Sequence, residues 1–94
     1  MLEFKDLTIR EILNRILWNQ RKKRADYVLT FIHRGAHMNR KVIPFNLIRE
    51  VKASWFSYGR EDEEVIIPFH RILEVKNVKN GKLIWEKTSV ELKH

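Results

Sequence analysis

Two stretches of the sequence share one frame: VIPFNLIREVK at residues 42–52 and IIPFHRILEVK at residues 66–76. Ile, Pro, Phe, Ile, Glu, Val and Lys stand at the same places in both. In each, a short extended piece reaches a proline, which has no N–H to donate to a sheet, so we expect a bend there and a strand that resumes at Glu-Val-Lys. The frame therefore predicts two similar strand–turn–strand corners.

The two corners differ in the chemistry of their turns. Asn46-Leu47 fills the first turn with neutral side chains, whereas His70-Arg71 places two nitrogen-rich side chains in the second. An ancient duplication and convergence on one corner geometry both explain the resemblance, because a single extra copy is too few for a stacked-repeat fold. In either case the shared residues pack, and the turn residues are candidates for function.

Periodicity outlines the rest of the fold. Residues 8–11 (TIRE) have the form of a capping box, and apolar residues follow at helical spacing, which predicts a helix. Residues 27–33 alternate as a strand with apolar residues on both faces, as is typical of a central strand. Asn80-Gly81 predicts a two-residue hairpin turn. Residues 20–24 are basic, and we expect them to form a solvated loop.

The strand after the first corner is expected to continue to Tyr58. Alternation then places Trp55 on one face of the sheet and Phe56 and Tyr58 on the other. These elements predict an α+β fold with residues 1–94 as a single domain. One N-terminal helix packs on a mostly antiparallel sheet of about five strands, for which a barrel-like curl is one option.

Composition limits the classes of partner. Nineteen Lys and Arg against twelve Asp and Glu give a formal net charge of +7, and such a field attracts polyanions, most commonly nucleic acid. A cationic but otherwise inert surface is the alternative. The absence of cysteine excludes disulfides, thiolate metal sites and a cysteine nucleophile. Since neither a membrane span nor a signal peptide is evident, we expect a cytoplasmic protein without a membrane partner.

A second dipeptide, His33-Arg34, is similar to His70-Arg71, and each stands at the end of an apolar run. An imidazole donates to a phosphate oxygen in either charge state, and a neighbouring guanidinium adds a planar cationic fork. The two pairs would form a compact phosphate clamp if the fold brings them together. A histidine that only hydrogen-bonds to its own turn is the competing interpretation.

Four stretches carry a resemblance to a known family: LNRILW, FIHRG, IPFHRILEV and NGKLIWEK, at residues 13–18, 31–35, 67–75 and 80–87. In this order they resemble small uncharacterised archaeal proteins whose domain is described as a predicted RNA cyclic-group-end recognition domain. The resemblance covers nearly the whole chain. It implies recognition of RNA ends, proposed to be 2′,3′-cyclic phosphates, and partnership with RNA-processing enzymes. The site residues that it implies are Asn14, Arg15, Trp18, His33, Arg34, His70 and Arg71, with Trp85 near the end of the motif set.

Trp18 falls opposite the apolar stripe of the predicted helix, adjacent to Asn14. Either the helix ends near it and the ring folds back onto the sheet, or the ring stays accessible for stacking. RNA ends are recognised by phosphate and 2′-hydroxyl contacts combined with bases stacked on aromatic or arginine planes. Trp85 stands in an apolar hairpin strand, which favours packing.

Three classes of function fit these residues, and an RNA-binding module without cofactor or metal is favoured. A phosphodiesterase-type enzyme would use His33 and His70 as general base and acid, but the His-x-Thr/Ser pairs of two-histidine phosphoesterases are absent. His33 and His37 have the spacing of helical metal ligands, yet Gly35 between them argues against a helix. A protein–protein adaptor for RNA-processing enzymes is the third class.

Overall fold

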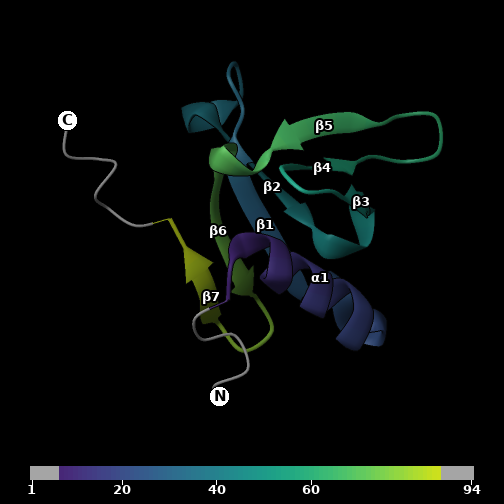
Figure 1. Cartoon of the computed structure of the whole chain (residues 1–94). Coiled ribbons are helices and arrows are strands. Elements are labelled where there is room, and N and C mark those ends of the chain that lie inside the picture. The colour runs from purple at the N-terminus through teal and green to yellow at the C-terminus, as the bar shows by residue number, and fades with distance from the viewer. Residues whose placement is uncertain (1–6, 88–94) are drawn as a thin grey trace.

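The computed structural model describes residues 7–87, apart from the side chain of His37. Within that range the chain has an α+β architecture with one α-helix, seven strands and four short 3-10 turns (Figure 1). No helix in this part of the chain is long and apolar enough to cross a membrane. The elements in chain order are α1 (Ile9–Asn19), η1 (Arg21–Asp26), β1 (Tyr27–Ile32), η2 (His37–Asn39), β2 (Arg40–Pro44), η3 (Phe45–Leu47), β3 (Ile48–Val51), β4 (Trp55–Tyr58), β5 (Val65–Pro68), η4 (Phe69–Arg71), β6 (Ile72–Asn77) and β7 (Lys82–Glu86).

The strands form two antiparallel sheets, ordered β2-β1-β6-β7 and β3-β4-β5. The α+β class, the N-terminal helix and the central position of β1 are confirmed. The single barrel-like sheet of about five strands is not confirmed, because the described residues form two sheets and no closed barrel. One reason is the bend at residues 52–54, which turns the chain back so that Val51 pairs with Phe56. The expected long strand to Tyr58 is therefore a hairpin.

The two corners carry the chain from one sheet to the other. β2 continues through η3 into β3 of the three-stranded sheet, and β5 continues through η4 into β6 of the four-stranded sheet. Pro44 (φ −78°, ψ 152°) and Pro68 (φ −66°, ψ 147°) end the incoming strands with similar backbone angles. Since proline cannot donate to a ladder, sheet pairing ends there and the chain changes sheets. The predicted strand–turn–strand corners are confirmed.

The similarity of the corners extends to the strands that pair with them. β1 pairs with β2 and β6, and β4 pairs with β5 and β3. The registers match as well, since Leu29 lies opposite Ile43 and Phe56 lies opposite Ile67. β1–β2–η3–β3 and β4–β5–η4–β6 are thus two units with the same arrangement, each divided between the sheets. Convergence on a corner alone would not require the partner strands to match, so this extent favours duplication.

One hydrophobic core joins α1 to both sheets. The helix begins at the predicted capping box, where the Glu11 N–H donates to Thr8 Oγ1 (3.2 Å) and the Thr8 N–H donates to Glu11 Oε1 (2.8 Å). Phe31 packs against the ring of Phe56 with centroids 6.0 Å apart. The buried apolar residues are Ile12, Leu13, Ile16, Leu17, Tyr27, Leu29, Phe31, Ile43, Phe45, Ile48, Phe56, Tyr58, Ile67, Ile72 and Val75.

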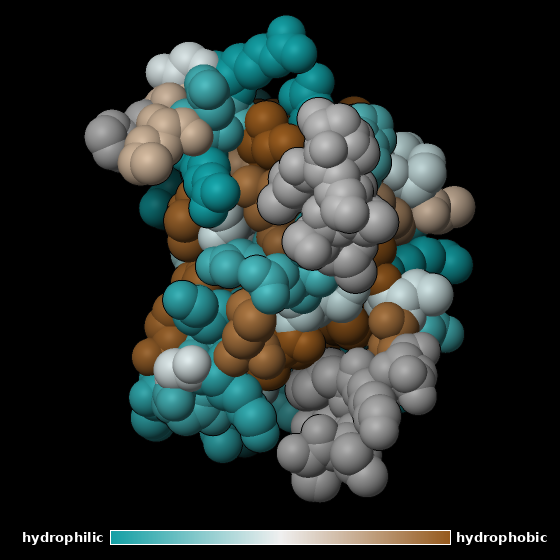
Figure 2. All heavy atoms as spheres, turned by 90° about the vertical axis from the view of Figure 1, so that its left-hand side faces the viewer, coloured by the Kyte–Doolittle hydropathy of each residue, from teal (hydrophilic) through white to brown (hydrophobic). Residues whose placement is uncertain are grey.

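The aromatic residues divide as alternation and packing predict. Phe56 and Tyr58 are buried, whereas Trp55 is half-buried. Trp85 is half-buried and packs against the core, as expected. The β6–β7 hairpin leaves Val78 and Leu83 exposed. From the β7 side of the molecule, apolar side chains are visible among hydrophilic ones (Figure 2).

Two local predictions are confirmed only in part. Arg21, Lys22 and Lys23 are exposed, as expected of a solvated segment, but they belong to η1 rather than to an irregular loop. The half-buried Arg24 guanidinium donates to the Leu17 carbonyl near the end of α1. The β6–β7 turn comprises residues 78–81 rather than Asn80-Gly81 alone, because Asn77 pairs with Lys82. The Asn77 side-chain oxygen accepts from the N–H groups of Lys79 and Asn80, which stabilises the wider turn.

Candidate nucleic-acid interface

The two His-Arg pairs leave the same end of the β1–β6 ladder. Phe31 of β1 lies opposite Ile72 of β6 in an antiparallel pair. His33 follows Phe31 by two residues, and His70 precedes Ile72 by two residues. Both His-Arg pairs therefore adjoin the same end of the β1–β6 ladder, which the sequence alone could not show.

The first pair lies in the turn after β1. His33 is half-buried, and its ring packs edge-on against Phe31 with centroids 6.1 Å apart. The backbone N–H of His33 donates to the Asn39 carbonyl (2.9 Å), and the backbone carbonyl of His33 accepts from the Ala36 N–H (3.1 Å). Arg34 is exposed in this turn. The loop thus fixes the backbone of His33 and leaves the Arg34 side chain in solvent.

The second pair lies in η4, where His70 is exposed and Arg71 is half-buried. Lys87, directly after β7, donates from Nζ to the His70 carbonyl and from its N–H to the Leu73 carbonyl (2.9 Å). On the other side the Phe69 N–H donates to the Ser54 carbonyl (3.0 Å). Hydrogen bonds to the backbone therefore hold this turn from both flanks while His70 remains accessible.

This end of the sheet is predominantly cationic. Arg40 and Lys41 of β2 lie opposite Ile32 and Phe31, so both adjoin the end of β1. The Lys41 ammonium also lies 5.4 Å from the centroid of the Tyr58 ring. Glu74 and Glu86, which face each other across β6 and β7, offset only part of this charge. The cations at this end are Arg34, Arg40, Lys41, Arg71 and Lys87, an arrangement that suits an anionic ligand.

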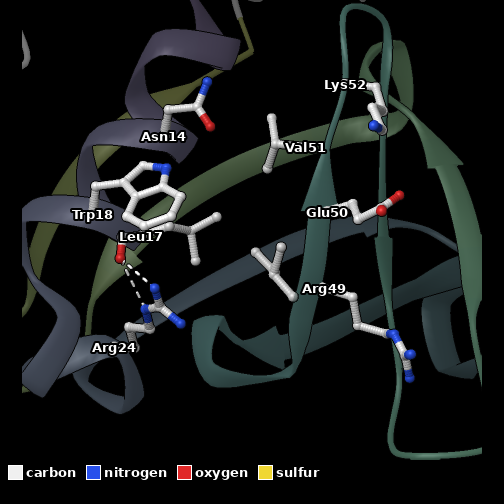
Figure 3. A pocket seen from close by; sticks show the side chains of 9 residues that line it. Asn14, Leu17, Trp18, Arg24, Arg49, Glu50, Val51 and Lys52 are labelled. Atoms are coloured by element: carbon white, nitrogen blue, oxygen red, sulfur yellow. Dashed lines mark hydrogen bonds between the residues drawn. The ribbon is translucent and has the colours of Figure 1, made fainter.

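Asn14 and Trp18 lie elsewhere, on the side of α1 that faces β3 (Figure 3). Trp18 is 65% exposed, so the interpretation in which its ring folds into the core is wrong. Both side chains line a groove of about 380 Å³ that also includes Arg24 and β3. Arg15 is half-buried and lines a shallower hollow on α1 with Glu11, Asn14 and Asn19.

The predicted site residues therefore fall into two groups at opposite ends of β1. η1 contacts η3 near the start of the strand, where Val28 lies opposite Pro44. η4 lies at the other end, where Phe31 lies opposite Ile72. The helix residues belong with the first corner and the His-Arg pairs with the second. The single binding set implied by the resemblance is thus divided.

Residues 5–87 match the family model described as the MJ1316 RNA cyclic group end recognition domain. The chain belongs to this family. Its relatives include three archaeal proteins: the UPF0248 protein of Methanococcus vannielii (39% identical, covering 88% of this chain and 95% of the relative), the UPF0248 protein MJ1316 of Methanocaldococcus jannaschii (38%, 84% and 92%) and the UPF0248 protein TK0315 of Thermococcus kodakarensis (42%, 84% and 90%). No solved structure matches the chain.

Two cations beside the predicted site residues were not among them. Lys87, directly after β7, reaches the carbonyl of His70, a residue 17 positions earlier in the chain. Arg24 reaches the Leu17 carbonyl and joins the groove that contains Trp18. Their bonds are to backbone carbonyls, which every residue has, so no residue pattern marks them. In the described range no group of three His, Cys, Asp or Glu is placed to hold a metal ion.

Proposed function

We propose that this chain binds RNA and recognises a terminal 2′,3′-cyclic phosphate through His33, Arg34, His70 and Arg71. The family description, RNA cyclic group end recognition, supports the class of ligand. The observation that carries the proposal is the register of β1 against β6, since both His-Arg pairs leave the end at which Phe31 lies opposite Ile72.

The chemistry of the two pairs suits this ligand. A cyclic phosphate carries a single negative charge shared by two non-bridging oxygens. A guanidinium fork donates to two such oxygens at once, and an imidazole adds a donor to one of them. Each pair has one exposed and one half-buried member. The half-buried member acts where water screens less, so its attraction for the phosphate is stronger than at an open surface.

The internal repeat supplies a precise variant for testing the site. His70→Asn combined with Arg71→Leu gives the second corner the turn residues of the first. Both turns have an exposed residue followed by a half-buried one. The backbone angles of the residues that follow, Ile48 (φ −73°, ψ 130°) and Ile72 (φ −72°, ψ 131°), are also nearly the same. The double variant should therefore keep its fold while losing the imidazole and the cationic guanidinium fork.

Binding should be measured with matched short RNAs that end in 2′,3′-cyclic phosphate, 3′-phosphate or 3′-hydroxyl, at fixed salt. We expect the wild type to prefer the cyclic end, and the double variant to bind that end about 10- to 100-fold more weakly, since hydrogen bonds to charged groups contribute about 1.5–3 kcal/mol each. The reciprocal variant, Asn46→His with Leu47→Arg, should leave the preference unchanged. Equal wild-type binding to all three ends would refute end recognition, and an unaffected double variant would refute this site.

The presence of two histidines at one end of the sheet also supports a second candidate, a phosphodiesterase that opens the cyclic phosphate. His33 and His70 would then act as general base and acid, with an arginine stabilising the developing charge. The ends of the RNAs should therefore be analysed after the incubation. Conversion of the cyclic end by the wild type, absent from His33→Ala and His70→Ala variants, would establish an enzyme.

A further inference from the structure

The groove between α1 and β3 is lined by none of the four residues of the His-Arg pairs, and its Arg24 and Ile48 end lies near the first corner. Its volume of about 380 Å³ is within the range of small-ligand sites, about 300–1,000 Å³. Leu17 and Ile48 are buried in its floor, and Val51 is half-buried. The groove is thus apolar at its base and large enough for a planar ring.

Trp18 forms one wall of this groove, across from Val51 (Figure 3). Trp18 is 65% exposed although apolar side chains lie directly beside it. A large aromatic residue is usually buried to a greater extent. An exposed indole beside an apolar floor provides a flat surface for stacking, and every nucleobase has a face that can occupy it.

Asn14 lies one helical turn before Trp18 and lines the same groove (Figure 3). Its amide offers two donor hydrogens and an acceptor oxygen on one short side chain. The edges of unpaired bases present donors and acceptors of the same kind. The groove therefore combines a stacking surface with a group that can bond to the edge of a base.

The basic turn η1 adjoins this groove. Arg21, Lys22 and Arg24 line a neighbouring hollow, and Arg24 lines the groove as well. The Nε of Arg24 donates to the Leu17 carbonyl (3.0 Å), and its Nη2 donates to the same oxygen. These bonds orient the guanidinium and do not involve Nη1. The cationic side chains therefore extend from the groove along the surface, where they could contact the phosphates of a single-stranded nucleic acid.

We propose that this groove binds one unpaired nucleobase of RNA, stacked on Trp18 with its edge against Asn14, while the adjoining phosphates lie along Arg21, Lys22 and Arg24. The inference rests on the proposed RNA binding and adds a contact remote from the RNA end. The Trp18 side of the groove adjoins η1 at the start of β1, whereas the His-Arg pairs leave the other end of this strand. An RNA of several nucleotides can occupy both regions, whereas a dinucleotide cannot.

Charge favours RNA over a protein as the occupant. Glu50, the acidic residue that lines the groove, lies on the far side of β3 from Trp18, as does Lys52 (Figure 3). Arg49 is engaged elsewhere, because its Nη1 donates to the carbonyls of Arg60, Glu61 and Glu63. The Trp18 side of the groove therefore faces the cations of η1, which attract a polyanion whose bases are exposed.

The test compares wild type with Trp18→Ala and Trp18→Phe in binding to single-stranded RNAs of two and eight nucleotides, each with a cyclic or a hydroxyl end. Loss of stacking should weaken octamer binding by about 5- to 100-fold in Trp18→Ala. Trp18→Phe should recover much of this loss. Binding of the dinucleotide with a cyclic end should change little, because the His-Arg pairs hold that end. Leu83→Ala removes an exposed apolar side chain outside the groove and should leave both affinities unchanged. Because Trp18 is exposed, thermal unfolding of its variants should match that of the wild type.

Octamer binding that is unchanged in Trp18→Ala would overturn the proposal, and so would an equal loss for the dinucleotide with a cyclic end. A poly-glutamate peptide that competes as well as RNA of equal charge would identify a protein-binding surface and overturn it too. The end-recognition proposal fails separately, when the wild type does not discriminate cyclic from hydroxyl ends. In that case a Trp18-dependent gain with RNA length would still support the base-binding groove.

Discussion

Replacing Gly59 with alanine should cost this domain much of its stability. Gly59 has φ +138°, a backbone conformation that side chains rarely tolerate. A Cβ at this position would lie 2.4 Å from the Glu63 carbonyl oxygen and 2.9 Å from its carbon, both of them backbone atoms. The Gly59 N–H also donates to the Leu47 carbonyl (3.0 Å). Alanine would therefore force apart a loop that is fastened to the first corner.

The magnitude follows from two contributions. A sparsely populated backbone conformation costs about 1–3 kcal/mol, and overpacking that displaces backbone costs about the same again. Their sum is about 4 kcal/mol at its centre, against a total of about 5–14 kcal/mol for a domain of this length. The melting temperature of Gly59→Ala should accordingly fall by about 15–30 °C.

Urea unfolding followed by far-ultraviolet circular dichroism would measure this loss, with Gly81→Ala as the control. Gly81 also has a positive φ, of +75°, but a Cβ at this position would meet no heavy atom within 4 Å. Gly81→Ala should therefore lose only about 1–2 kcal/mol, the cost of a left-handed alanine. Equal losses in the two variants would refute the argument from the contact with Glu63.

Three further measurements test the core and the charged surface. Phe45→Ala should lose about 3–5 kcal/mol in the same urea assay because Phe45 is 0% exposed. Phe69 stands at the same place in the second corner but is half-buried, so Phe69→Ala should lose about half as much. Similar losses in the two variants would contradict this difference in burial. Ser57→Ala should leave the free energy of unfolding unchanged or raise it by up to about 1 kcal/mol, since the buried Ser57 Oγ has no hydrogen-bond partner among the described residues. A marked loss of stability would instead reveal such a partner. The logarithm of RNA affinity should fall linearly with the logarithm of salt concentration. Lys22→Gln should reduce the steepness of that slope by about 0.7, the contribution of one phosphate contact to a single strand. An unaltered slope would place Lys22 outside the interface.

Local features of the fold were predictable because their causes are local. The capping box at Thr8 and Glu11 involves residues three apart, and its two hydrogen bonds are present. The prolines of both corners act on their own backbone, so the bends could be expected wherever the frame occurs. Asn80-Gly81 marked the hairpin, but the Asn77 side chain set its loop length.

Pairing between distant strands could not be predicted in the same way. The bend at residues 52–54 contains no glycine or proline. No local sequence signal therefore predicted that the long strand would divide into β3 and β4. The placement of the two His-Arg pairs at one end of the sheet depends on the pairing of β1 with β6, which are far apart in sequence. The exposure of Trp18 likewise depends on where β3 lies. Helical periodicity alone could not decide between a ring that folds onto the sheet and a ring that stays accessible.

The exchange of strands between the two repeated units makes the folding of each half depend on the other. β1 of the first unit is completed by β6 of the second, and β4 of the second is completed by β3 of the first. A cut in the bend at residues 52–54 would therefore produce two fragments, each with an unpaired strand edge that the other fragment fits. The domain is thus topologically equivalent to an intertwined dimer whose subunits have been fused, and its halves should fold only by reassociating.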